Sequence, residues 1–327
     1  MNVCFAAVIA LLCIPLSALA AEQDTAKPVE VAVGIYLNQV RELSLRDSQF
    51  VVDFWIWFRW KKGAVVEGEV LDPLKSYEIS GGDIESRANE FREDLAGTEW
   101  SYATERVVAR VVQVFDVSQF PQDRHHLVIA IEDGEHEEAL VTLTVDSANS
   151  RIDPKVHVPG FRVRNFESAI VQHAYKTNYG DVTLPSDSES IYSRCEFTLN
   201  IERPGFGYTL KLMWGMWLSA LVALLALFIK PVHVDPRFGL PVGAIFAAMA
   251  NQYIVSSVLP DSATVTSADI AGMATIIVIL IGVAESVASL WLYENEQAAL
   301  SIRLDRCTTI AVLCVYAAIN VYAFVFR

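Results

Sequence analysis

The chain has 327 residues, 53% of them hydrophobic, and a formal net charge of −14. The charge is uneven, because residues 21–206 contain 32 acidic and 19 basic side chains, whereas residues 207–327 contain 7 and 6. This division predicts an acidic soluble domain followed by an apolar membrane domain. Nucleic acid is excluded as a partner, because phosphate binding needs a basic face and the sequence shows none.

The first segment, residues 1–20, is expected to be a secretory signal peptide. It contains no charged side chain and ends in Ala18-Leu19-Ala20, small residues of the kind that a signal peptidase recognises. The lack of Lys or Arg near its start keeps an uncleaved anchor as the alternative. The cysteines that would remain are Cys195, Cys307 and Cys314, and they imply no disulfide framework.

Residues 21–206 are predicted to form an all-β domain, an immunoglobulin-like sandwich. Short runs of β-branched and aromatic residues, such as VEVAVGIYL and FVVDFWIWFRW, alternate with turn-forming clusters of Gly, Pro, Asn and Asp. A length of about 180 residues with strands throughout suits one sandwich. Residues 86–95 are rich in charge, and the sequence leaves open whether they form a short helix or a solvated loop.

Residues 207–327 are predicted to form an all-α domain of four membrane-spanning helices. The apolar segments cover residues 208–229, 238–259, 267–293 and 307–326, and each is long enough to cross a bilayer. Basic residues lie between the first two segments and between the last two, whereas residues 260–266 contain none. The positive-inside rule therefore predicts a multi-pass protein of the plasma or inner membrane, with the N-terminal domain and the C-terminus outside.

Several residues, in order along the chain, together carry a family resemblance. They are the pair Trp55 and Trp60, the motif Phe120-Pro121-Gln122-Asp123, Tyr192, Arg203 just before the first span, and the interval from Arg237 to Pro260. With a β-domain and four spans, this order resembles the pentameric ligand-gated ion channels, in particular bacterial-type homologues of the Cys-loop neurotransmitter receptors. The resemblance covers nearly the whole mature chain. It implies a homopentamer in a lipid bilayer, opened by a small-molecule or ionic ligand or by protons.

The second apolar segment corresponds to the pore helix of that family. At 100° per residue, Gly239, Gly243, Phe246, Ala250 and Ser257 fall within about 40° of one line. The resemblance implies that this line faces the pore, with Phe246 as a gate and Asp235 as a ring of carboxylates that favours cations. The alternative is tight helix packing through the two glycines. Asn251 and Gln252 lie off this line and are expected to bond to neighbouring helices, and Pro241 is expected to disturb the helix.

The resemblance places the ligand at Trp55, Glu132, Asp133, Glu135 and Tyr192. Glu132 and Asp133 begin the densest acidic run, EDGEHEE, where Gly134 stands roughly in place of the tryptophan of the family. Carboxylates gathered in this way would suit Ca²⁺ as a modulator, with Glu135, Glu137 and Glu138 as candidate ligands. The alternative is a solvated turn. No other cofactor is expected.

Coupling between the domains is implied for Glu42, Asp123, Arg203 and Pro260, with Arg203 pairing with Asp123 or Glu42. His125 and His126 follow Asp123-Arg124, and histidine titrates near neutral pH, so gating by protons is one interpretation. The strand pattern places one of the two toward solvent, and an ordinary surface role is the favoured interpretation. Glu285 lies within the third apolar segment, where a carboxyl group is either functional or hydrogen-bonded between helices.

Two alternatives to a channel stay open. The first is a ligand-sensing membrane receptor that has the same fold and does not conduct. The second is a membrane-anchored metalloenzyme that uses His125, His126 and the acidic run. Neither a His-x-x-x-His pattern nor a Ser/His/Asp set supports the enzyme, so no enzymatic activity is expected.

Overall fold

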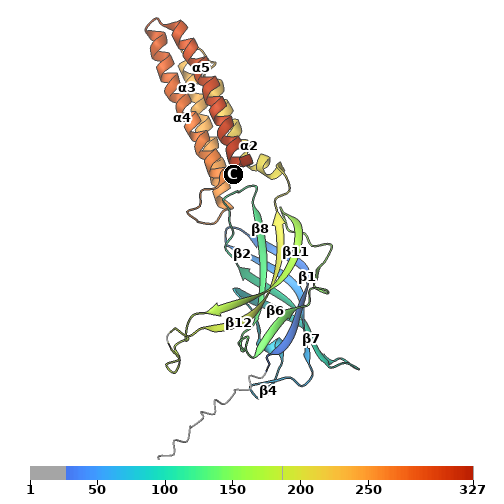
Figure 1. Cartoon of the computed structure of the whole chain (residues 1–327). Coiled ribbons are helices and arrows are strands. Elements are labelled where there is room, and N and C mark those ends of the chain that lie inside the picture. Colours follow the sequence, from blue (N-terminus) through green and yellow to red (C-terminus); the bar gives the residue numbers. More distant parts are fainter. Residues whose placement is uncertain (1–26, 186, 327) are drawn as a thin grey trace, which may run out of the picture.

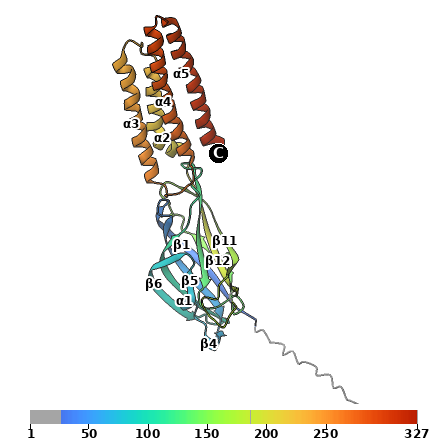
Figure 2. The ribbon, with the colours of Figure 1, turned by 90° about the vertical axis from the view of Figure 1, so that its left-hand side faces the viewer.

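The computed structural model describes residues 27–185 and 187–326. A β-rich domain is followed by a bundle of helices (Figure 1). Figure 2 shows that the bundle stands at one end of the β-rich domain rather than alongside it. The expected signal peptide, residues 1–20, lies outside the described residues.

Within the described residues, the β-rich domain has two main sheets. One contains β1 (Val29–Ser44), β2 (Gln49–Lys61), β6 (Gly82–Asp94), β7 (Trp100–Val112), β9 (Val141–Val145) and β10 (Arg151–Ile152). It is mixed, since β1 pairs antiparallel with β2 and parallel with β9 and β10. The other contains β5 (Tyr77–Ile79), β8 (Arg124–Asp133), β11 (Arg162–Tyr175) and β12 (Ser190–Glu202), in the order β11-β12-β8-β5. The strands β3 (Val65–Val66) and β4 (Glu69–Val70) and the short helix α1 (Pro73–Ser76) connect β2 to β5.

The two sheets share one hydrophobic core. Every second side chain of β2 is buried from Phe54 to Phe58, and β8 shows the same alternation from His125 to Ile129, as expected when one face of each strand points inward. Burial of each such apolar side chain stabilises the fold by about 1.5–3 kcal/mol. The apolar runs in the sequence therefore form strands, and their buried side chains pack together between the two sheets.

The segment 86–95, left open between helix and loop, lies almost entirely in strand β6. It pairs with β7 through most of its length, with an irregularity between Ala88 and Phe91 where Asn89 has φ of 54°. Nearly all its side chains are exposed, because β6 is the last strand in the order of its sheet. Charged residues on an edge strand oppose pairing with further strands. The charged side chains that hid the strand pattern in the sequence are therefore appropriate at the edge of the sheet.

Four of the described helices are long and apolar enough to cross a membrane. They are α2 (Gly207–Ala226), α3 (Val234–Ser257), α4 (Ser267–Glu294) and α5 (Ala298–Val321), and α5 continues as the π-helical turn η1 (Tyr322–Phe326). α4 contacts the other three helices, and α3 packs on α2 and α4. This arrangement indicates a multi-pass membrane protein.

Two helices begin earlier than the apolar segments suggested. α3 starts at Val234 and runs without a break through Pro241, which is buried in the first half of the helix. Pro241 therefore does not end the helix, although its ring nitrogen cannot donate a backbone hydrogen bond. α5 starts at Ala298, nine residues before the predicted 307, because Ser301 and Asp305 are buried against neighbouring helices. The first turns of α5 are polar, and the sequence does not show the buried partners of these polar residues. Hydropathy therefore predicts a later start for this membrane helix.

The hydrophobic core continues from the β-rich domain into the bundle. One cluster of buried residues includes Phe120 of the β-rich domain together with Met213 of α2, Val255 of α3 and Ala268 of α4. The backbone N–H groups of Ser267 and Ala268 donate to the carbonyls of Ser118 and Phe120 at 3.0 and 3.1 Å. The domains therefore meet in a packed junction.

Candidate functional site

Asp123 lies at the centre of this junction and is fully buried. Its Oδ2 atom is 2.5 Å from Nε2 of His125, and its Oδ1 atom accepts from Nε of Arg203 at 3.3 Å. Burial by itself would raise the pKa of Asp123, but the hydrogen bond to His125 and the charge of Arg203 hold it below its usual value. Asp123 is therefore an ionised carboxylate at neutral pH.

Arg203 touches both domains. Its guanidinium carbon lies 3.9 Å from the ring centre of Phe161 in the β-rich domain and 4.1 Å from that of Tyr208 in α2. Its Nη1 atom donates to the carbonyl of Gly160 at 3.3 Å. Gly160 has φ of 78°, and a Cβ there would lie 2.7 Å from Nη1 of Arg203, so a side chain at this position is excluded. This cation is therefore held by aromatic faces of both domains and by the buried carboxylate of Asp123.

The other expected coupling residues lie nearby in different roles. Glu42 faces Arg110, at 3.9 Å, and Arg203 pairs with Asp123 instead. Pro260 is half-buried directly after α3. Nη1 of Arg46 donates to the carbonyl of Ser257 at 3.4 Å, a contact between the β-rich domain and the end of α3 that the sequence did not suggest.

The two histidines face opposite ways. His126 is exposed and bonds to Asn200, as expected of a surface residue. His125 is buried beside Asp123, edge-on to Phe115 and Phe161. One of the two histidines therefore faces solvent, as the strand pattern predicts. The surface interpretation is wrong for His125, because successive side chains of a strand point to opposite faces of the sheet.

A second site is a pocket of about 420 Å³ on the sheet that contains β8 and β12. Three of the predicted ligand residues line it, namely Glu132, Asp133 and Tyr192. Glu78, Gly134, Tyr175 and Tyr179 complete the lining. The rings of Tyr179 and Tyr192 lie 6.4 and 5.5 Å from that of Tyr175, so three aromatic side chains gather beside three carboxylates.

Glu132 is almost fully buried and is held on two sides. It accepts from the hydroxyl of Tyr175 at 2.6 Å and from Nε of Arg194 at 3.0 Å. Partial burial, and then the hydrogen bond to Glu132, raise the pKa of Glu78. Burial and then the carboxylate of Glu132 likewise raise the pKa of Tyr175. The only basic side chain bonded to these groups within the described residues is Arg194, so the pocket retains an excess of negative charge.

The acidic run is more than a solvated turn at its start. Asp133 is buried and accepts from the hydroxyl of Ser76 at 3.0 Å and from the N–H groups of Glu135 and His136 at 2.9 and 3.0 Å. Glu138 lies outside the pocket and accepts from Gln172 at 2.7 Å. The described residues contain no group of three or more His, Cys, Asp or Glu that could hold a metal ion, so Ca²⁺ at Glu135, Glu137 and Glu138 gains no support.

Trp55 does not join the pocket within one chain. It lies in β2, on the other sheet, where it is half-buried between Tyr36 and Arg106 in the strand register. Glu135 also lies outside the pocket lining. A ligand contact for Trp55 would require a second copy of the chain.

The third site is the face of α3 that points away from the bundle. Asp235, Gly239, Gly243, Phe246 and Ala250 are exposed, and Ser257 is half-buried. The opposite face carries Ala244 and Ala248, which pack with Ala223 of α2 and Ile279 of α4. Phe246 is 72% exposed. Apart from the backbone of α3 itself and the chain neighbours, no described residue has an atom within 4 Å of a Cβ built on Gly239 or Gly243, so the described part of the chain does not pack on these glycines.

Asn251 and Gln252 point into the bundle, which confirms their predicted role. Nδ2 of Asn251 donates to the carbonyl of Leu212 at 3.0 Å, and Nε2 of Gln252 donates to Oδ1 of Asp269 at 3.0 Å. Glycines on the neighbouring helices make room for them. A Cβ on Gly215 would lie 3.3 Å from the Asn251 amide, and one on Gly272 would clash with the amide of Gln252.

Glu285 belongs to a buried ionic cluster at the other end of the bundle. Nη2 of Arg237 lies 3.2 Å from Oε2 of Glu285 and 2.5 Å from Oδ1 of Asp305. Nη1 of Arg237 donates to the carbonyl of Ile229 at 2.6 Å. The cluster joins α3, α4 and α5, so Glu285 is bonded between helices.

A scan against protein-family models found no match to this chain, and a search of curated proteins found none either. The sites are therefore assessed on their geometry. Sequence reasoning missed Glu78, Tyr175, Tyr179 and Arg194 in the pocket, and the partners of Arg237. Tyr175 and Tyr192 contact one another diagonally across β11 and β12, because the register pairs Tyr192 with His173 and Tyr175 with Ser190. No local pattern in the sequence gives this register.

Proposed function

We propose that the chain is a subunit of a pentameric ligand-gated ion channel that selects cations and is opened by a small organic cation. In this proposal the β-rich domain is an immunoglobulin-like sandwich outside the cell, and α3 of each copy lines the pore.

The face of α3 is the observation that carries the proposal. Phe246 and the glycines beside it point away from their own bundle, while the opposite face of the same helix is buried. Contact with lipid would not account for a line of small residues (Gly239, Gly243 and Ala250) that contains one phenyl ring, that of Phe246. Five such helices around an axis would make a narrow path that the phenyl rings close by excluding water. Asp235 at the start of the helix would favour cations.

The pocket supports a cationic ligand. Glu132 and its acidic neighbours attract positive charge, and the rings of Tyr175, Tyr179 and Tyr192 offer π-faces to an ammonium group. In an assembled ring, Trp55 of the adjacent copy would supply a further ring. Movement of the loop before β9 would reach the bundle through Asp123 and Arg203.

The test is current across a planar bilayer that contains the full chain, with unequal concentrations of a monovalent salt on the two sides. We expect openings that reverse near the cation equilibrium potential. Phe246→Ala should raise the open fraction, because the ring that excludes water is removed.

Phe228→Ala is the matched control, since Phe228 is 69% exposed but lies beyond the end of α2. It should leave the currents unchanged. Folded protein that stays silent with both variants, while amines still bind to it, would favour a non-conducting receptor with the same fold.

A further inference from the structure

A cluster of arginines stands at the membrane end of the sheet that contains β8, β11 and β12. Arg162 and Arg164 contact Glu202 at 2.5 and 2.6 Å, and Nε of Arg124 lies 4.0 Å from the same carboxylate. Three cations thus share one anion. Hydrogen bonds from Arg162 and then Arg164 keep the pKa of Glu202 below its usual value, so the cluster holds two positive charges in excess at neutral pH.

The three guanidinium groups are available to a further anion. The side chains of Arg124, Arg162 and Arg164 are 74%, 60% and 58% exposed, whereas that of Glu202 is 8% exposed. Their position is also unusual, because this domain has 32 acidic and only 19 basic residues in 21–206. Glu202 lies five residues before Gly207, where the first apolar helix begins, so in a membrane protein the cluster would lie near the surface of the bilayer.

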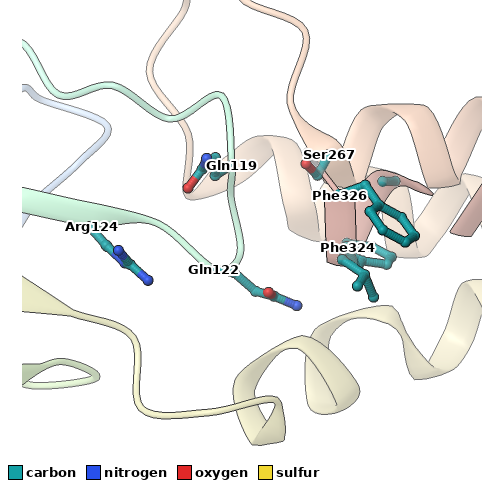
Figure 3. A pocket seen from close by; sticks show the side chains of 8 residues that line it. Gln119, Gln122, Arg124, Ser267, Phe324 and Phe326 are labelled. Atoms are coloured by element: carbon teal, nitrogen blue, oxygen red, sulfur yellow. The ribbon is translucent and has the colours of Figure 1, made fainter. Parts of the chain in front are cut away.

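Arg124 also borders a pocket of about 310 Å³ between the two domains (Figure 3). Its polar lining comes from Gln119, Gln122, Arg124 and Ser267. Its apolar lining comes from the end of the chain, where Phe326 is 76% exposed and Phe324 half-buried. In Figure 3, Gln122 extends toward Phe324. Polar groups at one side and exposed phenyl rings at the other match the two halves of an amphipathic molecule.

We propose that this pocket and the adjoining arginines bind the headgroup of an anionic phospholipid from the leaflet that faces the β-rich domain. The phosphate would lie on Arg124 with the amide of Gln122 and the hydroxyl of Ser267 near it, and Arg162 and Arg164 would attract the remaining charge. The acyl chains would run down beside Phe324 and Phe326. Free phosphate would use only the polar half, so the exposed rings favour a lipid. The inference requires a membrane protein but does not depend on conduction.

The test uses the full chain in detergent, titrated with dioctanoyl phosphatidylglycerol, dioctanoyl phosphatidylcholine or inorganic phosphate, with bound molecules counted by native mass spectrometry. We expect phosphatidylglycerol to bind more tightly than phosphatidylcholine. Arg124→Gln should weaken binding of phosphatidylglycerol about fivefold, as should each of Arg162→Gln and Arg164→Gln, with little effect on phosphatidylcholine.

The matched control is the pair of variants Lys61→Gln and Lys62→Gln. Each removes an exposed cation at the C-terminal end of β2, away from the arginine cluster. Arg124→Gln guards against misfolding, since it gives up only the longest of the three contacts to Glu202. Equal binding of the two lipids, or full displacement of phosphatidylglycerol by an equal concentration of inorganic phosphate, would overturn the proposal. So would unchanged binding in the folded Arg124→Gln variant.

Discussion

Buried carboxylates in the β-rich domain are held by arginines that stay partly in solvent. Asp53 is 1% exposed and accepts from Nε and Nη2 of Arg106 at 2.9 and 2.8 Å, and also bonds to Arg41 and Asn38. The hydrogen bond from Arg106, opposed by burial and aided by Arg41, lowers the pKa of Asp53 to about 2. Such a carboxylate links the stability of the domain to pH.

The first prediction concerns this linkage. The unfolded pKa of Asp is about 3.9, so the stabilisation by Asp53 is complete above about pH 4 and is lost as pH falls toward the folded value. Asp53→Asn should lower the free energy of unfolding at pH 7 by about 1–2 kcal/mol. It should also make the fall in stability between pH 4 and pH 2 less steep. Thermal unfolding midpoints in detergent provide the measurement. Asp47→Asn, on an exposed turn, is the control. An unchanged acid slope in Asp53→Asn would contradict the assignment.

The second prediction concerns the ligand pocket. If the ligand is a small organic cation, Glu132→Gln should weaken its binding about tenfold or more, because a buried charge-assisted contact is lost. A panel of primary and quaternary amines, followed by calorimetry on the full chain, provides the measurement. The control variant Glu138→Gln, which alters a half-buried acid outside the pocket, should bind like the parent. Equal affinity in the two variants would remove Glu132 from the site.

Single elements are positioned by a few polar contacts within otherwise apolar packing. α3 is fixed near its start by Arg237, in its second half by Asn251 and Gln252, and at its end by the contact from Arg46 to Ser257. Each of these side chains faces the protein, and the line with Phe246 does not. A helix held from one side in this way leaves its other face free for a neighbouring copy or a pore.

The third prediction concerns the ionic cluster that joins α3, α4 and α5. Arg237→Met would leave Glu285 and Asp305 buried without their cation and should destabilise the bundle by about 3–5 kcal/mol. Thermal unfolding in detergent would show this as a large fall in the midpoint. Arg303→Met removes an exposed cation of α5 and should change little. If both variants unfold alike, the cluster contributes nothing specific.

At the scale of the whole molecule, the two domains form one continuous packed unit. The core cluster runs from the sheets through Phe120 into α2, α3 and α4, and Arg203 lies between aromatic rings of both domains. A rearrangement in the β-rich domain would therefore displace the bundle rather than be absorbed by a linker. This continuity supports the proposed channel, in which the β-rich domain would control the bundle.

The fourth prediction of this Discussion follows from the proposed ring. Native mass spectrometry of the full chain, released from detergent, should give the mass of five copies. The same experiment on Phe246→Ala should also give five, since that side chain would line the axis without holding the copies together. A monomer or dimer in gentle detergent would contradict the channel proposal and leave the lipid site untouched.

The sequence by itself determined the order of a β-rich domain and four apolar helices, because strand and helix periodicities are local and the apolar segments are long. It also identified Asp123 with Arg203, and Glu132 with Tyr192, as groups worth locating. Only the tertiary structure decided that β6 is a strand, that α5 begins at Ala298, that His125 is buried and that Arg237 holds Glu285. Arg237 shows the reason most clearly, because its partners Glu285 and Asp305 lie 48 and 68 residues away in the chain. From the sequence alone, a charged residue is expected to face solvent. The fold changes this expectation when it places an opposite charge beside the residue, or when it pairs the residue's backbone with a neighbouring strand.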